Sequence, residues 1–277
     1  MSSVVAVSGA FVKRLDTFAP LDVESAAPGD PRAALGIAVI GASGRLGQRI
    51  AALASQDPRV SLVAAITSRD SDARLLEISG FSAVIDASTE QGTHRAIGLA
   101  ARVGRPLLVA TTGLGGATIR SLEGLAEQVP VMVAPNLSRG VAILRRLVRE
   151  AAVLTGDAWD LDLVERHHRR KRDSPSGTAR QLVEVVRAAA GSDRLEGRVH
   201  SIRSGDEVGT HELRLANGEE ELVLSHRALS RDAFARGAIE AALWLARQPA
   251  GMHSFDRCLE APAPEVELVS RARDRAH

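Results

Sequence analysis

The feature that most constrains the fold is a series of short apolar runs that alternate with helical patterns between residues 36 and 138. Five runs predict buried strands: Ile37–Ile40, Leu62–Ile66, Ala83–Asp86, Pro106–Ala110 and Val131–Ala134. Helical patterns follow the first, third and fourth runs, the last two over 91–103 and 116–128. Short buried strands alternating with helices form a parallel sheet covered on both faces. We therefore expect an α/β fold with a Rossmann-like nucleotide-binding domain.

The pattern changes after about residue 138. Helices are predicted at 140–155, 178–190 and 232–247, strands at 160–165, 198–203, 209–216 and 219–226, and a loop at 166–177. Asn217-Gly218 is a strong hairpin signal between the last two strands. This half predicts an α+β substrate domain with an open mixed sheet, whose exposed edges an oligomer can cover.

These patterns divide the chain into three parts. We expect a flexible N-terminal extension over 1–35, because this stretch is rich in turn residues and weakly patterned. Residues 36–137 and 231–277 are expected to form the dinucleotide-binding domain. Residues 138–230 are expected to form the substrate-binding and oligomerisation domain.

Composition excludes several functional classes. The chain has 35 Lys+Arg against 34 Asp+Glu and 3% aromatic residues, so neither a basic field nor stacking platforms favour nucleic acid. A single cysteine, Cys258, excludes a disulfide framework and a cysteine-rich metal site. No apolar run approaches the roughly 20 residues that span a bilayer, and residues 1–35 do not resemble a secretory signal. We expect a cytoplasmic protein that acts on a small molecule and binds neither nucleic acid, membrane nor metal.

A glycine-rich turn follows the first predicted strand and opens a helix. Gly41, Gly44 and Gly47 have the spacing GxxGxxG, a variant of the dinucleotide fingerprint GxGxxG. Glycines allow a tight turn and close approach of the backbone, and the helix N-terminus offers N–H groups to a pyrophosphate. The turn therefore predicts dinucleotide binding. The alternative is a flavodoxin-like domain with a different ligand.

The end of the second strand predicts which nicotinamide cofactor is bound. An acidic residue there would bind the ribose 2′-hydroxyl of NADH, but the chain has Thr67-Ser68-Arg69. Hydroxyl groups and a guanidinium suit a 2′-phosphate. Ser68 and Arg69 therefore favour NADPH, with NADH as the alternative, unless Arg69 is only a solvated loop residue.

A basic loop between a strand and a helix carries the sharpest chemical signal. Seven of the eight residues in 166–173 are cationic or can become so. The helix that follows begins in Ser174-Pro175-Ser176-Gly177-Thr178, and a helix N-terminus also attracts anions. Two histidines and a lysine supply proton donors near neutral pH. The loop predicts a site for a small dianion; the alternative is an ordinary basic surface loop.

These residues match a family signature. The run Glu165-x-His167-His168-x-x-Lys171-x-Asp173-x-Pro175-Ser176-Gly177-Thr178-Ala179 closely resembles the E-x-HH-x-x-K-x-D-x-PSGTA signature of the dihydrodipicolinate reductases. The resemblance extends in order over about 36–260. It includes Val84–Ser88, Ala110–Gly113, Ala134–Ser138, Arg203–His211 and Ser225–Ala238.

The resemblance implies a reaction and a role for individual residues. Family members reduce 4-hydroxy-tetrahydrodipicolinate with NADPH or NADH in diaminopimelate and lysine biosynthesis, as homotetramers joined through their sheets. His167 would be the general acid/base and Lys171 the second proton donor, while His168, Gly177 and Thr178 would bind the dicarboxylate substrate. The pyrophosphate of the cofactor would lie against Gly41, Ala42, Ser43, Gly44, Arg45 and Leu46. The nicotinamide would lie against Ala110, Thr111, Thr112, Ala134, Pro135, Asn136 and Leu137. We also expect the five Lys and Arg residues in 166–172 to lower the pKa of His167 by like-charge repulsion.

Departures from the family pattern leave other functions open. The family commonly has Gly at the position of Ala110 and Phe or Met at that of Leu137. The segment between the second and third strands, Thr67 to Phe81, is also short. The alternatives are a diverged paralogue that reduces a different imine with NADPH and a non-catalytic NADPH-binding protein. The retained His167 and Lys171 argue against the second.

Overall fold

The computed structural model of the chain describes residues 34–191 and 193–260. The predicted extension therefore lies outside the described residues except at its end, where Leu35 already belongs to the first strand. Residues 261–277 of the predicted dinucleotide-binding domain also lie outside them.

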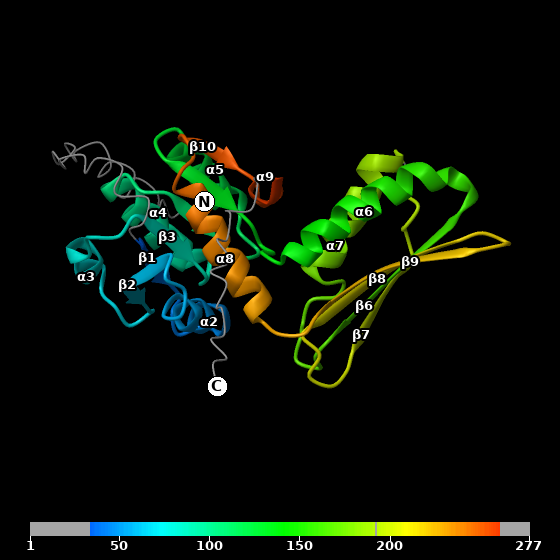
Figure 1. Cartoon of the computed structure of the whole chain (residues 1–277), viewed down its shortest axis with the longest axis horizontal. Helices are drawn as coiled ribbons and strands as arrows, with labels where there is room; N and C mark the ends of the chain where they lie inside the picture. The colour runs from blue at the N-terminus through cyan, green and yellow to red at the C-terminus, as the bar shows by residue number, and fades with distance from the viewer. Residues whose placement is uncertain (1–33, 192, 261–277) are drawn as a thin grey trace, which may run out of the picture. The chain divides into compact units, whose positions relative to one another are not determined.

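Two sheets organise the described part of the chain (Figure 1). The elements of the first sheet and its helices are β1 (Leu35–Ile40), α2 (Arg45–Ala54), β2 (Val60–Ile66), α3 (Asp72–Glu77), β3 (Ala83–Asp86), α4 (Glu90–Val103), β4 (Leu107–Val109), α5 (Gly116–Ala126), β5 (Pro130–Val133), α8 (Asp232–Leu245), β10 (Gly251–His253) and α9 (Phe255–Glu260). The six strands lie in the order β10-β5-β4-β3-β1-β2, and each pairs in parallel with its neighbours. The predicted parallel α/β sheet is confirmed.

Three short elements of this half escaped the sequence analysis. Helix α3 lies in the short segment after β2, and β10 and α9 follow α8. Strand β10 is Gly-Met-His, which carries no alternating apolar pattern, and its place is set by parallel pairing with β5. A three-residue strand of this kind is recognisable only from its neighbour.

Successive strand residues are buried on opposite faces of this sheet, as the period of two requires. On one face Ile37, Val39 and Ile85 pack with residues of α2 and α8. On the other, Ala38 and Val84 join residues of α4 and α5. Covering both faces explains why the strands read as uninterrupted apolar runs.

The second half builds a smaller mixed sheet. Its elements are α6 (Arg139–Thr155), the 3₁₀ turn Gly156–Ala158, β6 (Asp160–His167), α7 (Gly177–Ala190), β7 (Val199–Arg203), β8 (Gly209–Ala216) and β9 (Glu221–Ala228). The order is β7-β6-β8-β9, with β6–β7 parallel and the other pairs antiparallel. The predicted open mixed sheet is confirmed. The hairpin turn spans 217–220 and is two residues longer than the strand boundaries predicted.

Helices α6 and α7 lie on one face of this sheet (Figure 1). Leu161 and Leu163 of β6 and Leu213 of β8 pack against them. The opposite face carries exposed Ile202 and Val223. Within residues 34–191 and 193–260, no helix has both the length and the apolar character that crossing a bilayer requires.

Candidate active site

The glycine-rich turn joins β1 to α2 in a geometry that excludes side chains. Gly41 has φ +82°, and a Cβ there would lie 2.5 Å from the carbonyl oxygen of Ala87. A Cβ at Gly47 would lie 2.2 Å from the carbonyl oxygen of Gly41. Helix α2 begins without a side-chain cap in the described structure, so no capping side chain there competes with an anion for its first N–H groups. This cradle fits a pyrophosphate.

The loop after β2 contains a carboxylate that returns to the strand end. Asp70 accepts hydrogen bonds from the backbone N–H and hydroxyl of Thr67, at 2.8 and 2.9 Å. Arg74 donates to its other oxygen. Bonds from Thr67 hold the pKa of Asp70 below its usual range. Ser68 and Arg69 lie next to the Thr67–Asp70 hydrogen bonds and are exposed. The Arg69 guanidinium therefore contributes a positive charge to the surface of this loop.

A buried aspartate ties together the ends of β3 and β4. Asp86 is fully buried and accepts hydrogen bonds from the hydroxyls of Ser88, Thr93 (2.6 Å) and Thr111 (2.8 Å). Burial raises the pKa of Asp86, although the three hydroxyls oppose the rise. The sequence analysis assigned Asp86 no role. Its network holds Thr111, one of the predicted cofactor contacts, from the side away from solvent.

The other predicted cofactor contacts lie at the ends of β4 and β5. Ala110, Ala134 and Leu137 are buried in the core on the α8 side of the sheet. Thr112 and Pro135 are exposed. The Nδ2 of Asn136 donates to Thr178 Oγ1 at 2.8 Å, which joins a predicted cofactor segment to the predicted substrate helix.

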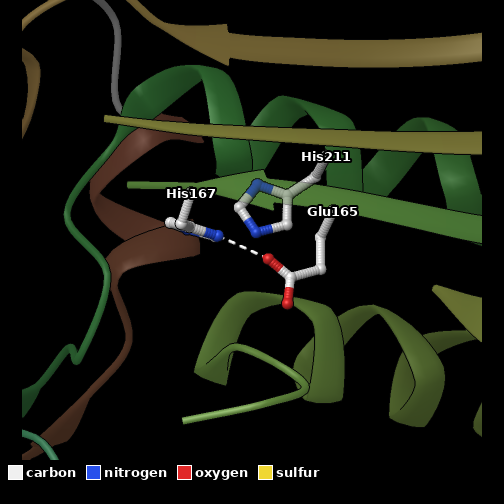
Figure 2. A group of neighbouring side chains, drawn as sticks. All are labelled: Glu165, His167 and His211. Carbon is white, nitrogen blue, oxygen red and sulfur yellow. Dashed lines mark hydrogen bonds and ion pairs between the residues drawn. The ribbon is translucent and has the colours of Figure 1, made fainter. Parts of the chain in front are cut away.

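His167 lies in a buried group of polar side chains with Glu165 and His211 (Figure 2). Glu165 and His167 are two residues apart on β6, so both point to the face that α6 and α7 cover. His211 is the antiparallel partner of Glu165 on β8. The Nδ1 of His167 bonds Glu165 Oε2. The two imidazoles meet edge to face, with ring centroids 5.2 Å apart.

The charge state of this group follows from its bonds. Burial alone would raise the pKa of Glu165, but hydrogen bonds from Arg203, Ser201 and His167 outweigh burial and hold it at about 2. Burial lowers the pKa of His211 to about 3. Glu165 is therefore ionised and His211 neutral at pH 7.

The pKa of His167 is lowered, as the sequence analysis expected, but the main cause is different. Burial is the largest contribution, and the charges of Lys171 and Arg203 add to it. The bond to Glu165 acts in the opposite direction. Arg203 lies outside the loop 166–172 to which the sequence analysis attributed the effect, because β7 brings it beside β6.

Two further residues of the loop, Lys171 and His168, are held by a salt bridge and by burial respectively. Lys171 Nζ lies 2.9 Å from Asp173 Oδ1 and its side chain is 23% exposed, so it is held but reachable from solvent. His168 is buried, and burial lowers its pKa, as do the charges of Arg231, Arg170 and Arg45. Arg45 belongs to the glycine-rich turn, so turn and loop act on the same imidazole.

The start of α7 lies beside the buried group of Glu165, His167 and His211. Ser176 caps the helix by accepting from the backbone N–H of Ala179 at 3.1 Å. Gly177 is exposed at the first helical position, and Thr178 is half-buried. Ser176 also donates its own N–H to Glu165 and lies 3.1 Å from His211 Nε2. The helix N-terminus is thus fastened to the histidine group.

Glu165, His167 and His211 are close enough for a metal ion, with candidate ligand atoms within 4.8 Å of one another. However, both oxygens of Glu165 already accept from Arg203. A guanidinium in this position opposes a cation and competes for the carboxylate. The donor set therefore fits a proton-handling group better than a metal centre.

Sequence reasoning singled out His167, His168 and Lys171 but gave no role to Glu165, Arg203 or His211. Glu165 and Arg203 are 38 residues apart and meet only through strand pairing. A usable signal was the spacing Glu165-x-His167, which places a carboxylate and an imidazole on the same face of a strand.

Two models of known protein families together match almost all of the described chain. The family model "Dihydrodipicolinate reductase, N-terminus" matches residues 35–137, and "Dihydrodipicolinate reductase, C-terminus" matches residues 140–259. The 4-hydroxy-tetrahydrodipicolinate reductase of Halorhodospira halophila is 36% identical over 80% of this chain and 97% of that protein. The reductase of the same name from Xanthomonas euvesicatoria is 40% identical over 79% of this chain and 95% of that protein.

Solved structures share the fold. A dipicolinate-bound dihydrodipicolinate reductase from Paenisporosarcina sp. TG-14 aligns with a TM-score of 0.68 at 16% identity, covering 81% of this chain and 99% of that one. A myo-inositol dehydrogenase from Corynebacterium glutamicum aligns with a TM-score of 0.53 at 15% identity, covering 82% and 94%. These likenesses concern the arrangement of strands and helices.

Proposed function

The chain belongs to the dihydrodipicolinate reductase family, and from this premise we propose that it reduces 4-hydroxy-tetrahydrodipicolinate to tetrahydrodipicolinate with a pyridine nucleotide. The step belongs to diaminopimelate and lysine biosynthesis. The observation that carries the proposal is the buried Glu165–His167 pair at the end of β6, followed directly by the basic loop and the start of α7.

His167 is the proposed proton donor. The substrate is a cyclic dicarboxylate that loses water to give a conjugated imine. A reduced nicotinamide, when bound, would supply a hydride to its unsaturated ring carbon, and His167 would give a proton to the electron density that remains. An imidazole does this well because it can be both charged and a competent donor near neutrality. Lys171 holds the developing negative charge or supplies a second proton.

The substrate carboxylates are proposed to bind between the loop and α7. Gly177 and Thr178 present the N-terminal N–H groups of α7, which favour an anion. His168 and Lys171 line the loop on the other side. Bringing a dianion to this loop adds negative charge beside His167. Its pKa then rises, so the proton is available only when substrate is present.

NADPH is the proposed cofactor. Gly41 and Gly44 hold the pyrophosphate against the start of α2, and Ser68 and Arg69 contact the 2′-phosphate. Asp70 is the nearby carboxylate that would favour NADH, but both its oxygens already accept bonds from Thr67 and Arg74. NADH is the alternative if those bonds open.

The proposed assembly is a cytoplasmic homotetramer. Residues 36–137 with 231–277 form the proposed dinucleotide-binding domain, and residues 138–230 bind substrate and join subunits. The sheet face opposite α6 and α7 carries the exposed side chains of Ile202 and Val223, which a second copy would cover. Sedimentation at micromolar concentration tests this, and a monomer would contradict it.

A coupled assay tests the activity. Product of dihydrodipicolinate synthase is mixed with the protein and NADPH, and loss of absorbance of the reduced nicotinamide is followed. We expect turnover in the wild type, with kcat lowered about 10²- to 10⁴-fold in His167→Gln and NADPH affinity unchanged. Binding of NADPH without turnover of this substrate would favour a diverged imine reductase or a non-catalytic protein. A His167→Gln variant with more than about half of wild-type kcat would show that another group donates the proton.

A further inference from the structure

Glu165 is a buried carboxylate to which the proposed reaction assigns no step of its own. It is fully buried in the middle of the small sheet. It is aligned with Ser201 on β7 and with His211 on β8, so the three side chains form one row across the sheet. A fully buried carboxylate needs charge-assisted bonds to be stable.

The structure supplies those bonds from four separate residues. Oε1 accepts from Ser201 Oγ at 2.7 Å, from the Ser176 backbone N–H at 3.2 Å and from Arg203 Nη2. Oε2 accepts from Arg203 Nη1 at 2.9 Å and faces Nδ1 of His167. Arg203 thus binds both oxygens in a bidentate arrangement and fixes the plane of the carboxylate.

An ionised carboxylate can only accept hydrogen bonds, so the nitrogen facing it must carry a hydrogen. Nδ1 of His167 is therefore protonated in both charge states of the ring. Nε2 is left as the atom that gains and loses a proton. This is the relation in which a second group sets the tautomer of a working histidine.

The surroundings of Nε2 are consistent with its being the nitrogen that exchanges a proton. A Cβ at Gly209 would lie 2.9 Å from Nε2 of His167, so the space beside this nitrogen depends on a residue without a side chain. The His211 ring lies edge to face against the imidazole and limits its rotation.

We propose, on the basis of the function proposed above, that Glu165 is a positioning residue: clamped by Arg203, it holds His167 as the Nδ1–H tautomer and stabilises the imidazolium. The proton given to the substrate leaves Nε2 of the imidazolium. The ring that remains is the neutral Nδ1–H tautomer, and water returns a proton to Nε2 before the next turnover.

Glu165→Gln is the direct test. Glutamine offers one oxygen, so it cannot accept both arms of Arg203 and also accept from Nδ1. We expect kcat to fall about 100-fold while the KM for NADPH changes less than about twofold. A donor must be protonated, so kcat falls as pH rises through the pKa of His167. Loss of the carboxylate destabilises the imidazolium, and this limb should move to lower pH by about one unit or more.

Two comparisons separate positioning from a general loss of structure. Glu184→Gln removes a carboxylate paired with Arg187 on the exposed side of α7, and should leave kcat and the pH limb unchanged. In a His167→Gln background, Glu165→Gln should cause no further loss of kcat, because its effect passes through His167. An unmoved pH limb, or a full additional loss in the double variant, would overturn the proposal.

A measurement on the wild type keeps the test independent of folding and of turnover. Long-range ¹H–¹⁵N correlation on histidine-labelled protein above pH 8 reports which ring nitrogen carries hydrogen, and His167→Gln assigns the signal. We expect His167 as the Nδ1–H tautomer. An Nε2–H tautomer would refute the positioning role. Absence of turnover with the Nδ1–H tautomer present would refute the proposed function alone.

Discussion

Replacing His211 tests how a buried imidazole sets the acid stability of the protein. His211 is 4% exposed, and burial lowers its pKa to about 3, against about 6.5 in an unfolded chain. Because the folded pKa is the lower one, the unfolded chain binds an additional proton between about pH 6.5 and about pH 3. The stability that depends on neutral His211 is therefore complete above about pH 6.5 and is lost as the pH falls through this window.

The size of the effect follows from the two pKa values. At about pH 5 an unfolded histidine is almost fully protonated, whereas folded His211 is still neutral. This pH is about 1.5 units below the unfolded pKa, and each unit lowers the free energy of unfolding by about 1.36 kcal/mol. The loss at about pH 5 is therefore about 2 kcal/mol. That is a large share of the stability of an ordinary domain.

His211→Gln removes the titrating group and keeps a side chain that can bond Ser176. Between about pH 7.5 and about pH 5, we expect the wild type to lose about 2 kcal/mol more free energy of unfolding than this variant. Urea unfolding followed by circular dichroism measures it, at one fixed protein concentration because association shifts apparent stability. His94→Gln, an exposed histidine on α4, is the matched control and should follow the wild type. Parallel pH curves for wild type and His211→Gln would refute the reasoning.

Three further predictions concern the cofactor, the loop and the core. Arg69→Ala should raise the Kd for NADPH about tenfold or more, since a charge-assisted hydrogen bond contributes about 1.5–3 kcal/mol. It should leave the Kd for NADH unchanged. Equal effects in a titration with both nucleotides would show that Arg69 does not contact the 2′-phosphate. Lys171→Ala should lower kcat about 100-fold and raise the substrate KM in the coupled assay, and a change in KM alone would limit Lys171 to binding. A Cβ at Gly237 would lie 1.8 Å from the Leu137 carbonyl oxygen, so Gly237→Ala should lower the free energy of unfolding in urea by about 3 kcal/mol or more. Gly98→Ala on α4, where a Cβ meets no atom of the described residues within 4 Å, should raise it by about 0.5–1 kcal/mol. Similar effects of the two changes would contradict this.

Most of the large sheet could be predicted because its signals are local. Runs such as Ile37–Ile40 are apolar on both faces, and the glycine turn lies directly between such a run and a helical pattern. Strand β10 could not be predicted, because Gly251–His253 has no pattern of its own and is a strand only beside β5. The hairpin at Asn217 was recognised from its turn residues, but its length was set by how β8 and β9 pair.

The sequence by itself determined the chemistry available to the site. The spacing of His167, His168 and Lys171 and the helix start at Ser176 are contiguous features that need no distant partner to be recognised. The spacing Glu165-x-His167 by itself places a carboxylate beside the imidazole, whereas only the tertiary structure decided which other groups act on this pair. Glu165, Arg203 and His211 come from three strands, and they meet because the register of a sheet is set by burial of its whole apolar face. No local pattern encodes that register, so the tautomer and charge of the imidazole are properties of the assembled sheet.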